Sequence, residues 1–223
     1  MVTNIANLWR GEPLMKKAVS SFIDMLKSDE QLINEAWDAV LGKADIEEIR
    51  QPLYDRDKSV NRNEHEVRRL LVEHLTLRPG ADISGCLVLM SLVKDAERIG
   101  DYAKNVFEVG VMMEGKSKEM KYIDSLSSIH SKLSANMPKL RSAFTESSEK
   151  LAKEILKQYT PIKVELNKMM EDLLEDQLST REAISTALAA RYLKRINSHI
   201  SNIASGVVYP LDQIDFVSGD IFE

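Results

Sequence analysis

The sequence predicts an all-α protein, and three observations support this fold class. Aromatic residues make up only 6% of the 223 residues, whereas hydrophobic residues make up 43%, a balance that favours helices over sheets. Apolar residues recur at steps of three and four along most of the chain, which is the period of an amphipathic helix. Only nine glycines and six prolines interrupt these segments, so the helices are expected to be long.

Two helices are expected before residue 80. The first spans about 13–41, because a stripe of apolar residues begins just after a proline that suits a first helical turn. Asp45, with Glu48 three residues later, forms a capped start for the second helix. Pro52 is expected to restart or kink this helix, since proline cannot donate a backbone hydrogen bond, and the Arg-Pro-Gly sequence at 78–80 ends it.

The third and fourth helices lie on either side of the midpoint of the chain. The third begins near residue 82 and ends at about Gly110 or Gly115, with Gly100 as its one internal breaker. The polar Gly-Lys-Ser-Lys stretch at 115–118 is the expected hinge between two halves. After it, one long apolar stripe covers 126–155, with a kink expected at Pro138.

Two further helices complete the second half. Thr160 and Pro161 predict the start of the fifth helix, because threonine can cap and proline fits the first turn. Ser179 with Glu182 has the form of a capping box and opens the sixth, which should stop by Pro210. The tail from 211 to 223 shows no clear period.

Charge and cysteine content exclude several classes of protein. A net charge of -5 and a pI near 5.5 argue against nucleic acid as a partner. The single cysteine, Cys86, allows neither a disulfide framework nor a thiolate metal site, so a reducing, cytoplasmic compartment is expected. No apolar run approaches the roughly 18 to 20 residues of a membrane span, and the start lacks the pattern of a signal peptide. Any membrane association is therefore expected to be peripheral.

Two carboxylates in the third helix are the main candidates for a binding site. Glu97 and Asp101 are four residues apart, so both side chains leave the same face of the helix, opposite its apolar stripe. This face is expected to point outward or into a groove. One interpretation is a solvated face on which Asp101 pairs with Lys104. The other is a hard-cation site shared with a second helix.

The segment ERIGDYAKN, preceded by the apolar run CLVLMSLV, resembles the signature of the PhoU family of phosphate-signalling regulators. Asp57, Asn61 and Glu64, in the segment DKSVNRNEHEV, resemble the DxxVNxxE element that precedes this signature. The resemblance implies that Glu97 and Asp101 bind a transition metal such as iron or zinc, with the three residues of the second helix as further ligands. The alternative for the second helix is a solvated flank whose acids pair with Lys58, Arg68 or Arg69.

The same resemblance implies two tandem three-helix bundles. The first repeat would span 1–116, and the second repeat with the C-terminal tail would span 117–223. Sequence similarity between the halves is slight, but Arg98-Ile99 and Arg195-Ile196 correspond at a constant offset. At the positions of the carboxylate pair, the second repeat has Lys194 and Ser198, which are poor metal ligands. At most one metal site is therefore expected, in the first repeat.

For function, the resemblance implies a non-enzymatic regulator of phosphate uptake and phosphate signalling. Such a protein would contact the ATPase of a phosphate ABC transporter and a sensor histidine kinase, exert indirect negative control of transcription, and form a homodimer. The alternatives are a metal-free helical scaffold and a regulator recruited to another transporter. A carboxylate di-metal enzyme ranks below both, because none of the four histidines follows a glutamate by three positions.

Overall fold

The computed structural model describes residues 13–78, 80, 83–113 and 120–214. Within these ranges the chain forms six long α-helices and one short 3-10 turn. They are α2 (Pro13–Val40), α3 (Ile46–Leu77), α4 (Ile83–Met113), α5 (Ile123–Thr145), α6 (Glu149–Glu175), α7 (Thr180–Val208) and η2 (Leu211–Gln213). The predicted all-α fold of two three-helix bundles is confirmed. None of these helices is both long and apolar enough to cross a membrane.

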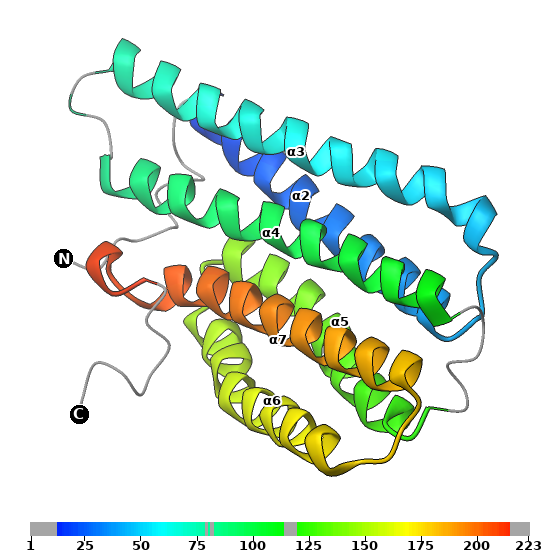
Figure 1. Ribbon diagram of the computed structural model, residues 1–223. Helices are drawn as coiled ribbons and strands as arrows, with labels where there is room; N and C mark the ends of the chain where they lie inside the picture. Colours follow the sequence, from blue (N-terminus) through cyan, green and yellow to red (C-terminus); the bar gives the residue numbers. More distant parts are fainter. Residues whose placement is uncertain (1–12, 79, 81–82, 114–119, 215–223) are drawn as a thin grey trace.

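The two bundles lie side by side and share one hydrophobic core. Figure 1 shows α3 along one edge of the molecule and α6 along the opposite edge, with the other helices between them. Helices α2, α3 and α4 pack together, as do α5, α6 and α7, and the bundles meet where α4 packs on α7 and α2 on α5. Phe22 of α2 and Phe144 of α5 are both buried, and their ring centroids lie 4.9 Å apart across this junction. The buried side chains therefore form a single cluster that includes both repeats.

The first three helices follow the predicted pattern closely. The Asp45 carboxylate caps α3, because its Oδ1 accepts hydrogen bonds from the backbone N–H groups of Glu47 and Glu48 at 2.9 and 3.3 Å. Pro52 does not restart this helix, which continues unbroken from Ile46. Proline is tolerated here because the position is exposed, so water can solvate the carbonyl that the proline leaves without a donor. The predicted hinge at 115–118 lies outside the described residues.

In the second bundle, two predicted boundaries are wrong. The stripe over 126–155 belongs to two helices, since α5 ends at Thr145 and α6 begins at Glu149. Ser147 adopts a φ of 52°, and the Ser148 hydroxyl caps α6 by accepting from the backbone N–H of Leu151. Thr160 and Pro161 lie inside α6 and do not start a helix. Both are exposed, so water can solvate the carbonyl that the proline leaves without a donor.

The last helix begins and ends as predicted. The Ser179 hydroxyl accepts from the backbone N–H of Glu182 at 3.2 Å, which is the capping arrangement that the sequence indicates. Helix α7 ends at Val208, two residues before Pro210. Of the predicted irregular tail, residues 211–213 form a 3-10 turn that contacts α4, and Ile214 is buried. Residues 215–223 lie outside the described part of the chain.

Substituting Gly110 with alanine is expected to destabilise the first bundle by about 1–2 kcal/mol. A Cβ atom at this position of α4 would lie 2.8 Å from backbone atoms of Ala39 and Val40 in α2, so the two helices would have to separate. The cost of separating the two helices exceeds the roughly 1 kcal/mol of stability that alanine gains over glycine within a helix. Chemical denaturation measures the difference, and Ser20→Ala on the exposed face of α2 is the control. A Gly110→Ala protein as stable as this control would contradict the close approach.

Candidate metal-binding site

The structure brings together acidic residues from three helices of the first bundle. Asp57, Asn61 and Glu64 lie on α3, and Glu97 and Asp101 lie on α4, which packs beside it. Asp29, on α2, is an additional acidic residue at this junction. We refer to the five carboxylates of this junction as the acidic cluster: Asp29, Asp57, Glu64, Glu97 and Asp101.

A lysine ammonium connects the two helices that carry the predicted ligands. The Nζ of Lys104 in α4 donates to Asp57 Oδ2 at 2.8 Å and to Asp101 Oδ1 at 3.3 Å. Asp57 is only 5% exposed, so this ammonium neutralises a buried carboxylate. The Asp101–Lys104 pair expected from the sequence is therefore present, but it is part of a contact between helices, which the sequence did not indicate.

The carboxylates of α4 are less exposed than the helical projection suggested. The side chain of Glu97 is 16% exposed and that of Asp101 is 28% exposed, because α3 covers one flank of α4. Arg98 forms ion pairs with both, at 3.4 Å to Glu97 and 3.0 Å to Asp101. On α3, Glu64 pairs with Arg68 at 2.7 Å, as in the solvated-flank interpretation, although Glu64 itself is buried.

Asp29 was not among the predicted site residues. It is completely buried, and neither of its carboxylate oxygens has a hydrogen-bond partner. Helix α4 approaches it at Gly100, where an added Cβ atom would lie 3.1 Å from Asp29 Oδ1. The sequence carries a signal for this residue, because Asp29 interrupts the apolar stripe of α2 between Met25 and Leu32. A charged residue at a core position of an amphipathic helix is uncommon and indicates a specific role.

Burial and mutual repulsion change the protonation of the cluster. Burial raises the pKa of Asp29 well above its ordinary value, and the charges of Asp57 and Glu97 raise it further. Burial also raises the pKa of Glu97 to about 7, with added contributions from the charges of Asp101 and Glu64 and a hydrogen bond to Asp101. For Lys104, burial lowers the pKa, but its hydrogen bonds and charge pairs with Asp57 and Asp101 outweigh this and raise it. The raised pKa values of Asp29 and Glu97, together with the positive charge of Lys104, limit the negative charge of the cluster near neutral pH.

Glu97→Gln is expected to stabilise the protein at pH 8 and to leave its stability nearly unchanged at pH 5. The folded-state pKa of Glu97, about 7, lies above the ordinary value of 4.5, so the folded protein holds this proton more tightly than the unfolded chain. The wild type therefore loses stability as pH rises from about 4.5 to about 7, whereas glutamine does not titrate. Because Arg98 and solvent partly relieve the charge, the gain at pH 8 is about 1–2 kcal/mol.

Urea denaturation at both pH values tests this expectation. Glu108→Gln is a control on the same helix, because the Glu108 carboxylate accepts a hydrogen bond from Tyr54 away from the acidic cluster. A Glu97→Gln gain of equal size at pH 5 and pH 8 would contradict a raised pKa at this residue.

The observed side-chain arrangement accommodates a metal ion only if Lys104 moves away. Among the described residues, no group of three or more histidine, cysteine, aspartate or glutamate side chains is arranged to hold a metal. Carboxylate and amide oxygens suit a hard cation, and Asp29 lacks any hydrogen-bonding partner. The Lys104 ammonium, however, lies between the acids of α3 and α4, where a cation would bind. Metal binding by these residues stays a prediction.

The corresponding seam of the second bundle has a different chemistry. Lys194 of α7 donates to Asn167 of α6 at 2.5 Å, and the Ser198 hydroxyl donates to the carbonyl of Lys194 at 3.1 Å. His199 points instead toward α4, where its Nδ1 lies 2.7 Å from Asp95. These side chains are already paired with protein atoms, and none of the three is a carboxylate.

Comparison with known proteins gives consistent results in sequence and structure. The PhoU domain matches residues 22–109 and again 126–207, one match in each bundle. A protein of Deinococcus radiodurans named phosphate-specific transport system accessory protein PhoU homolog is 25% identical over 204 residues, which cover 87% of this chain and 93% of that protein.

Two solved structures share the fold. The crystal structure of PhoU from Pseudomonas aeruginosa aligns with a TM-score of 0.81 at 23% identity, over 90% of this chain and 97% of that one. The phosphate transport system regulatory protein PhoU from Streptococcus pneumoniae aligns with a TM-score of 0.76 at 18% identity, over 88% and 94% of the two chains. With a domain match in each bundle and the same arrangement of helices, this chain belongs to the PhoU family.

Proposed function

We propose that this protein is an accessory regulator of a phosphate transport system that acts through protein contacts and not through catalysis. The observation that carries this proposal is the pair of PhoU domain matches, which together extend over both bundles. Its partners would be the ATPase of a phosphate ABC transporter and a sensor histidine kinase, through which it would lower transcription of phosphate-regulated genes. Its place would be the cytoplasmic side of the membrane, reached by binding the transporter.

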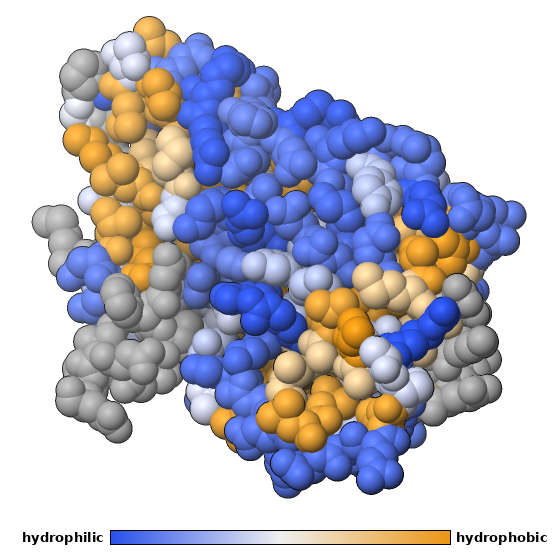
Figure 2. Space-filling view, viewed as in Figure 1, coloured by the Kyte–Doolittle hydropathy of each residue, from blue (hydrophilic) through white to orange (hydrophobic). Residues whose placement is uncertain are grey.

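An exposed apolar surface supports the part of the proposal that concerns protein contacts. Four exposed apolar residues belong to the last turns of α3 and the first turns of α4, and we call them the apolar tip: Val72, Leu77, Ile83 and Leu87. Leu77 is 66% exposed and Ile83 is 53% exposed. Figure 2 shows an extended hydrophobic region at this end of the molecule, next to the hydrophilic outer face of α3. Contiguous apolar surface of this kind is typical of sites where another protein binds.

Charge substitution at the apolar tip tests the proposal. We expect Leu77→Asp/Ile83→Asp to abolish co-purification with the transporter ATPase and the kinase, and to raise a phosphate-regulated reporter in phosphate-rich medium to the level expected on deletion of the gene. Ile184→Asp, on an exposed residue of α7 away from the tip, is the matched control. If deletion of the gene leaves both phosphate uptake and the reporter unchanged, and another transporter co-purifies, the alternative of recruitment to a different transporter is correct.

We further propose that Glu97 and Asp101, with Asp57, Asn61 and Glu64, hold one transition metal ion, iron or zinc, in the first repeat. The support is the cluster of oxygen ligands on adjacent helices and the unpartnered carboxylate of Asp29 beneath them. A bound metal would supply positive charge that holds the acids of α3 and α4 together. The second candidate is a metal-free regulator, and the position of Lys104 between these acids favours it.

Metal analysis by mass spectrometry separates the two candidates. For the metal-binding candidate, protein purified without an affinity-tag metal should contain about one metal ion per chain, and Glu97→Ala/Asp101→Ala should contain almost none. Glu171→Ala/Glu175→Ala, a carboxylate pair with the same spacing on the exposed face of α6, controls for non-specific binding. Wild type without metal, with the fold of the double variant intact, would establish the metal-free regulator.

A further inference from the structure

Helix α7 carries an unbalanced charge after its first turn. From residue 183 to its end it has no aspartate or glutamate, but it has three lysine or arginine residues: Arg191, Lys194 and Arg195. Lys194 and Arg195 follow Arg191 by three and four positions, so all three side chains leave the same side of the helix. Ser198, four positions after Lys194, lies on this side too. It is opposite to the side that packs into the core through Leu193, Ile196 and Ile200.

Helix α6 brings a fourth cation to the flank of this charged side. Lys194 Nζ donates to Asn167 Oδ1 of α6 at 2.5 Å. The Asn197 amide of α7 donates to the Tyr159 carbonyl of α6 at 3.1 Å. Lys163 lies midway between Tyr159 and Asn167 on α6, and its Nζ is 5.6 Å from the centre of the Tyr159 ring. Lys163 therefore lies along the line where α6 meets α7. We call this set the basic seam: Lys163, Asn167, Arg191, Lys194, Arg195 and Ser198.

The positive charge of the basic seam has no acidic partner. Among the residues that the structure describes, none of its four basic side chains forms an ion pair, and the hydrogen-bond partner of Lys194 is a neutral amide. Lys163 and Lys194 are both half-buried. Removing water from an ammonium costs free energy that one amide oxygen offsets only in part. Such an uncompensated charge is expected where a ligand of opposite charge binds.

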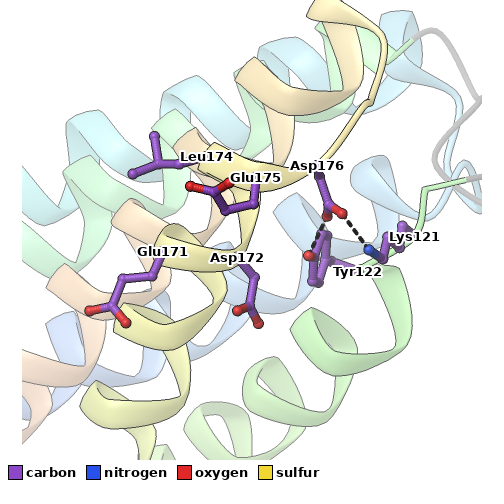
Figure 3. Close-up of a pocket in the computed structure, with 7 residues that line it drawn as sticks. All are labelled: Lys121, Tyr122, Glu171, Asp172, Leu174, Glu175 and Asp176. Carbon is purple, nitrogen blue, oxygen red and sulfur yellow. Dashed lines mark hydrogen bonds and ion pairs between the residues drawn. The ribbon is translucent and has the colours of Figure 1, made fainter.

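The acids of α6 that follow the seam do not neutralise it. Figure 3 shows them around the last turns of the helix: Glu171, Asp172, Glu175 and Asp176. They line a hollow of about 670 Å³ at the C-terminal end of α6, where Asp176 is bound by Tyr122 and by Lys121, the latter at 2.6 Å. Within the described part of the chain, none of these four acids pairs with a cation of the seam.

We propose that the basic seam binds a small tetrahedral oxyanion, either orthophosphate or the terminal phosphate of a nucleotide. The Lys194 ammonium uses one of its three donors on Asn167, so two are available to an anion. Lys163 supplies a second ammonium from the neighbouring helix, and Arg195 supplies a guanidinium. The Ser198 hydroxyl, which now donates to the Lys194 carbonyl, can rotate to donate to the anion. Hydrogen bonds from such charged donors to phosphate oxygens are short and strong.

The number of cations favours phosphate over a singly charged anion. A carboxylate carries one negative charge, whereas a phosphate group carries about −1.5 to −2 charges at pH 7 and three strong acceptor oxygens. The basic seam offers four positive charges and one hydroxyl from two helices. A doubly charged, tetrahedral group can therefore accept hydrogen bonds from both helices at once, whereas a planar carboxylate has only two oxygens for the same donors.

The two seams of the molecule are then opposite in charge. In the first bundle, Lys104 is neutralised by Asp57 and Asp101 at the seam of α3 and α4. In the second bundle, Lys194 has no carboxylate beside it, and Ser198 supplies a hydroxyl. The second seam thus has a preference of its own, for an anion. This inference concerns anion binding and does not depend on the proposed regulation of phosphate transport.

Titration of the full-length, ¹⁵N-labelled protein with orthophosphate or ATP, followed by NMR at constant ionic strength, tests the proposal. We expect saturable shifts of the backbone amides at 163–167 and 191–198. Lys163→Gln and Lys194→Gln keep polar side chains but remove one charge each, so each is expected to raise the dissociation constant by about tenfold. Saturation by orthophosphate identifies the free anion as a ligand, and saturation by ATP alone identifies the nucleotide.

Lys157→Gln is the matched control, because this exposed lysine of α6 lies outside the seam. It removes the same charge and should leave the dissociation constant unchanged. The spectra also report whether each variant keeps its fold. Absence of saturable shifts with either anion up to about 50 mM would overturn the proposal. Binding that Lys163→Gln and Lys194→Gln leave as tight as in the wild type would also overturn it, since the anion would then bind elsewhere. Equal weakening by Lys157→Gln would show attraction to net charge and no site at the seam.

Discussion

Replacing Phe144 with alanine is expected to lower the free energy of unfolding by about 3–5 kcal/mol and to destabilise both repeats together. Phe144 belongs to the second bundle, but its ring packs on Phe22 of the first, and both side chains are fully buried. Removing the ring leaves a cavity at the junction where the shared core is continuous. The repeats should therefore unfold in one transition, because neither keeps an intact core without the other.

Urea denaturation followed by circular dichroism and by tryptophan fluorescence measures this effect. Circular dichroism reports on all the helices, whereas Trp37 lies in α2 and stacks on His130 of α5, so its emission reports on the junction. Ile184→Ala, at an exposed position of α7, is the control and should change stability little. Two separate transitions, with only the second shifted by Phe144→Ala, would show that residues 1–116 and 117–223 are independent domains.

Most of the fold could be predicted from the sequence because helical periodicity is a local property. The stripe of α2, the Asp45 cap and the Ser179 capping box each depend on residues within a few positions of one another. The division between α5 and α6 was missed because the same periodicity continues across Ser147, where a single residue in the left-handed region breaks the helix. The error at Pro161 was the opposite one, because a boundary was predicted where the helix is continuous. Proline on an exposed face need not interrupt a helix, and α6 continues through it.

The candidate site was only partly predictable, because it depends on which helices pack together. The five proposed ligands could be found from their spacing and from the family resemblance. The role of Lys104 was not visible, since it reaches Asp57 on another helix 47 positions earlier in the chain. Asp29 interrupts the apolar stripe of α2, but its place in the cluster becomes visible only when α4 is seen to cover it at Gly100. Sequence patterns describe one helix at a time, whereas this cluster is formed where three helices meet.

Lys104→Met is expected to destabilise the metal-free protein by about 2–3 kcal/mol. Methionine keeps the length and the apolar stem of the side chain but removes the ammonium that neutralises Asp57 and Asp101. Asp57 is then a buried carboxylate without a cationic partner, next to Glu97 and the other acids of the cluster. The loss is smaller than for a fully buried pair, because the Lys104 side chain is 25% exposed. Denaturation in the presence of a chelator measures it, with Lys58→Met as the control, since Lys58 forms an exposed pair with Asp55.

The same substitution decides how Lys104 relates to a metal at this site. An ammonium between the acids repels an incoming cation, so its removal should increase the affinity for a divalent metal. Added zinc or ferrous iron should therefore raise the stability of Lys104→Met well above the small effect seen with wild type, because ligand binding stabilises the folded state. In that case the lysine and the metal compete for one place, and the carboxylates of α3 and α4 are ligands. If metal stabilises neither protein while Lys104→Met is clearly destabilised, the ammonium itself is the cation that joins the two helices, and the metal-free regulator is the correct description of this chain.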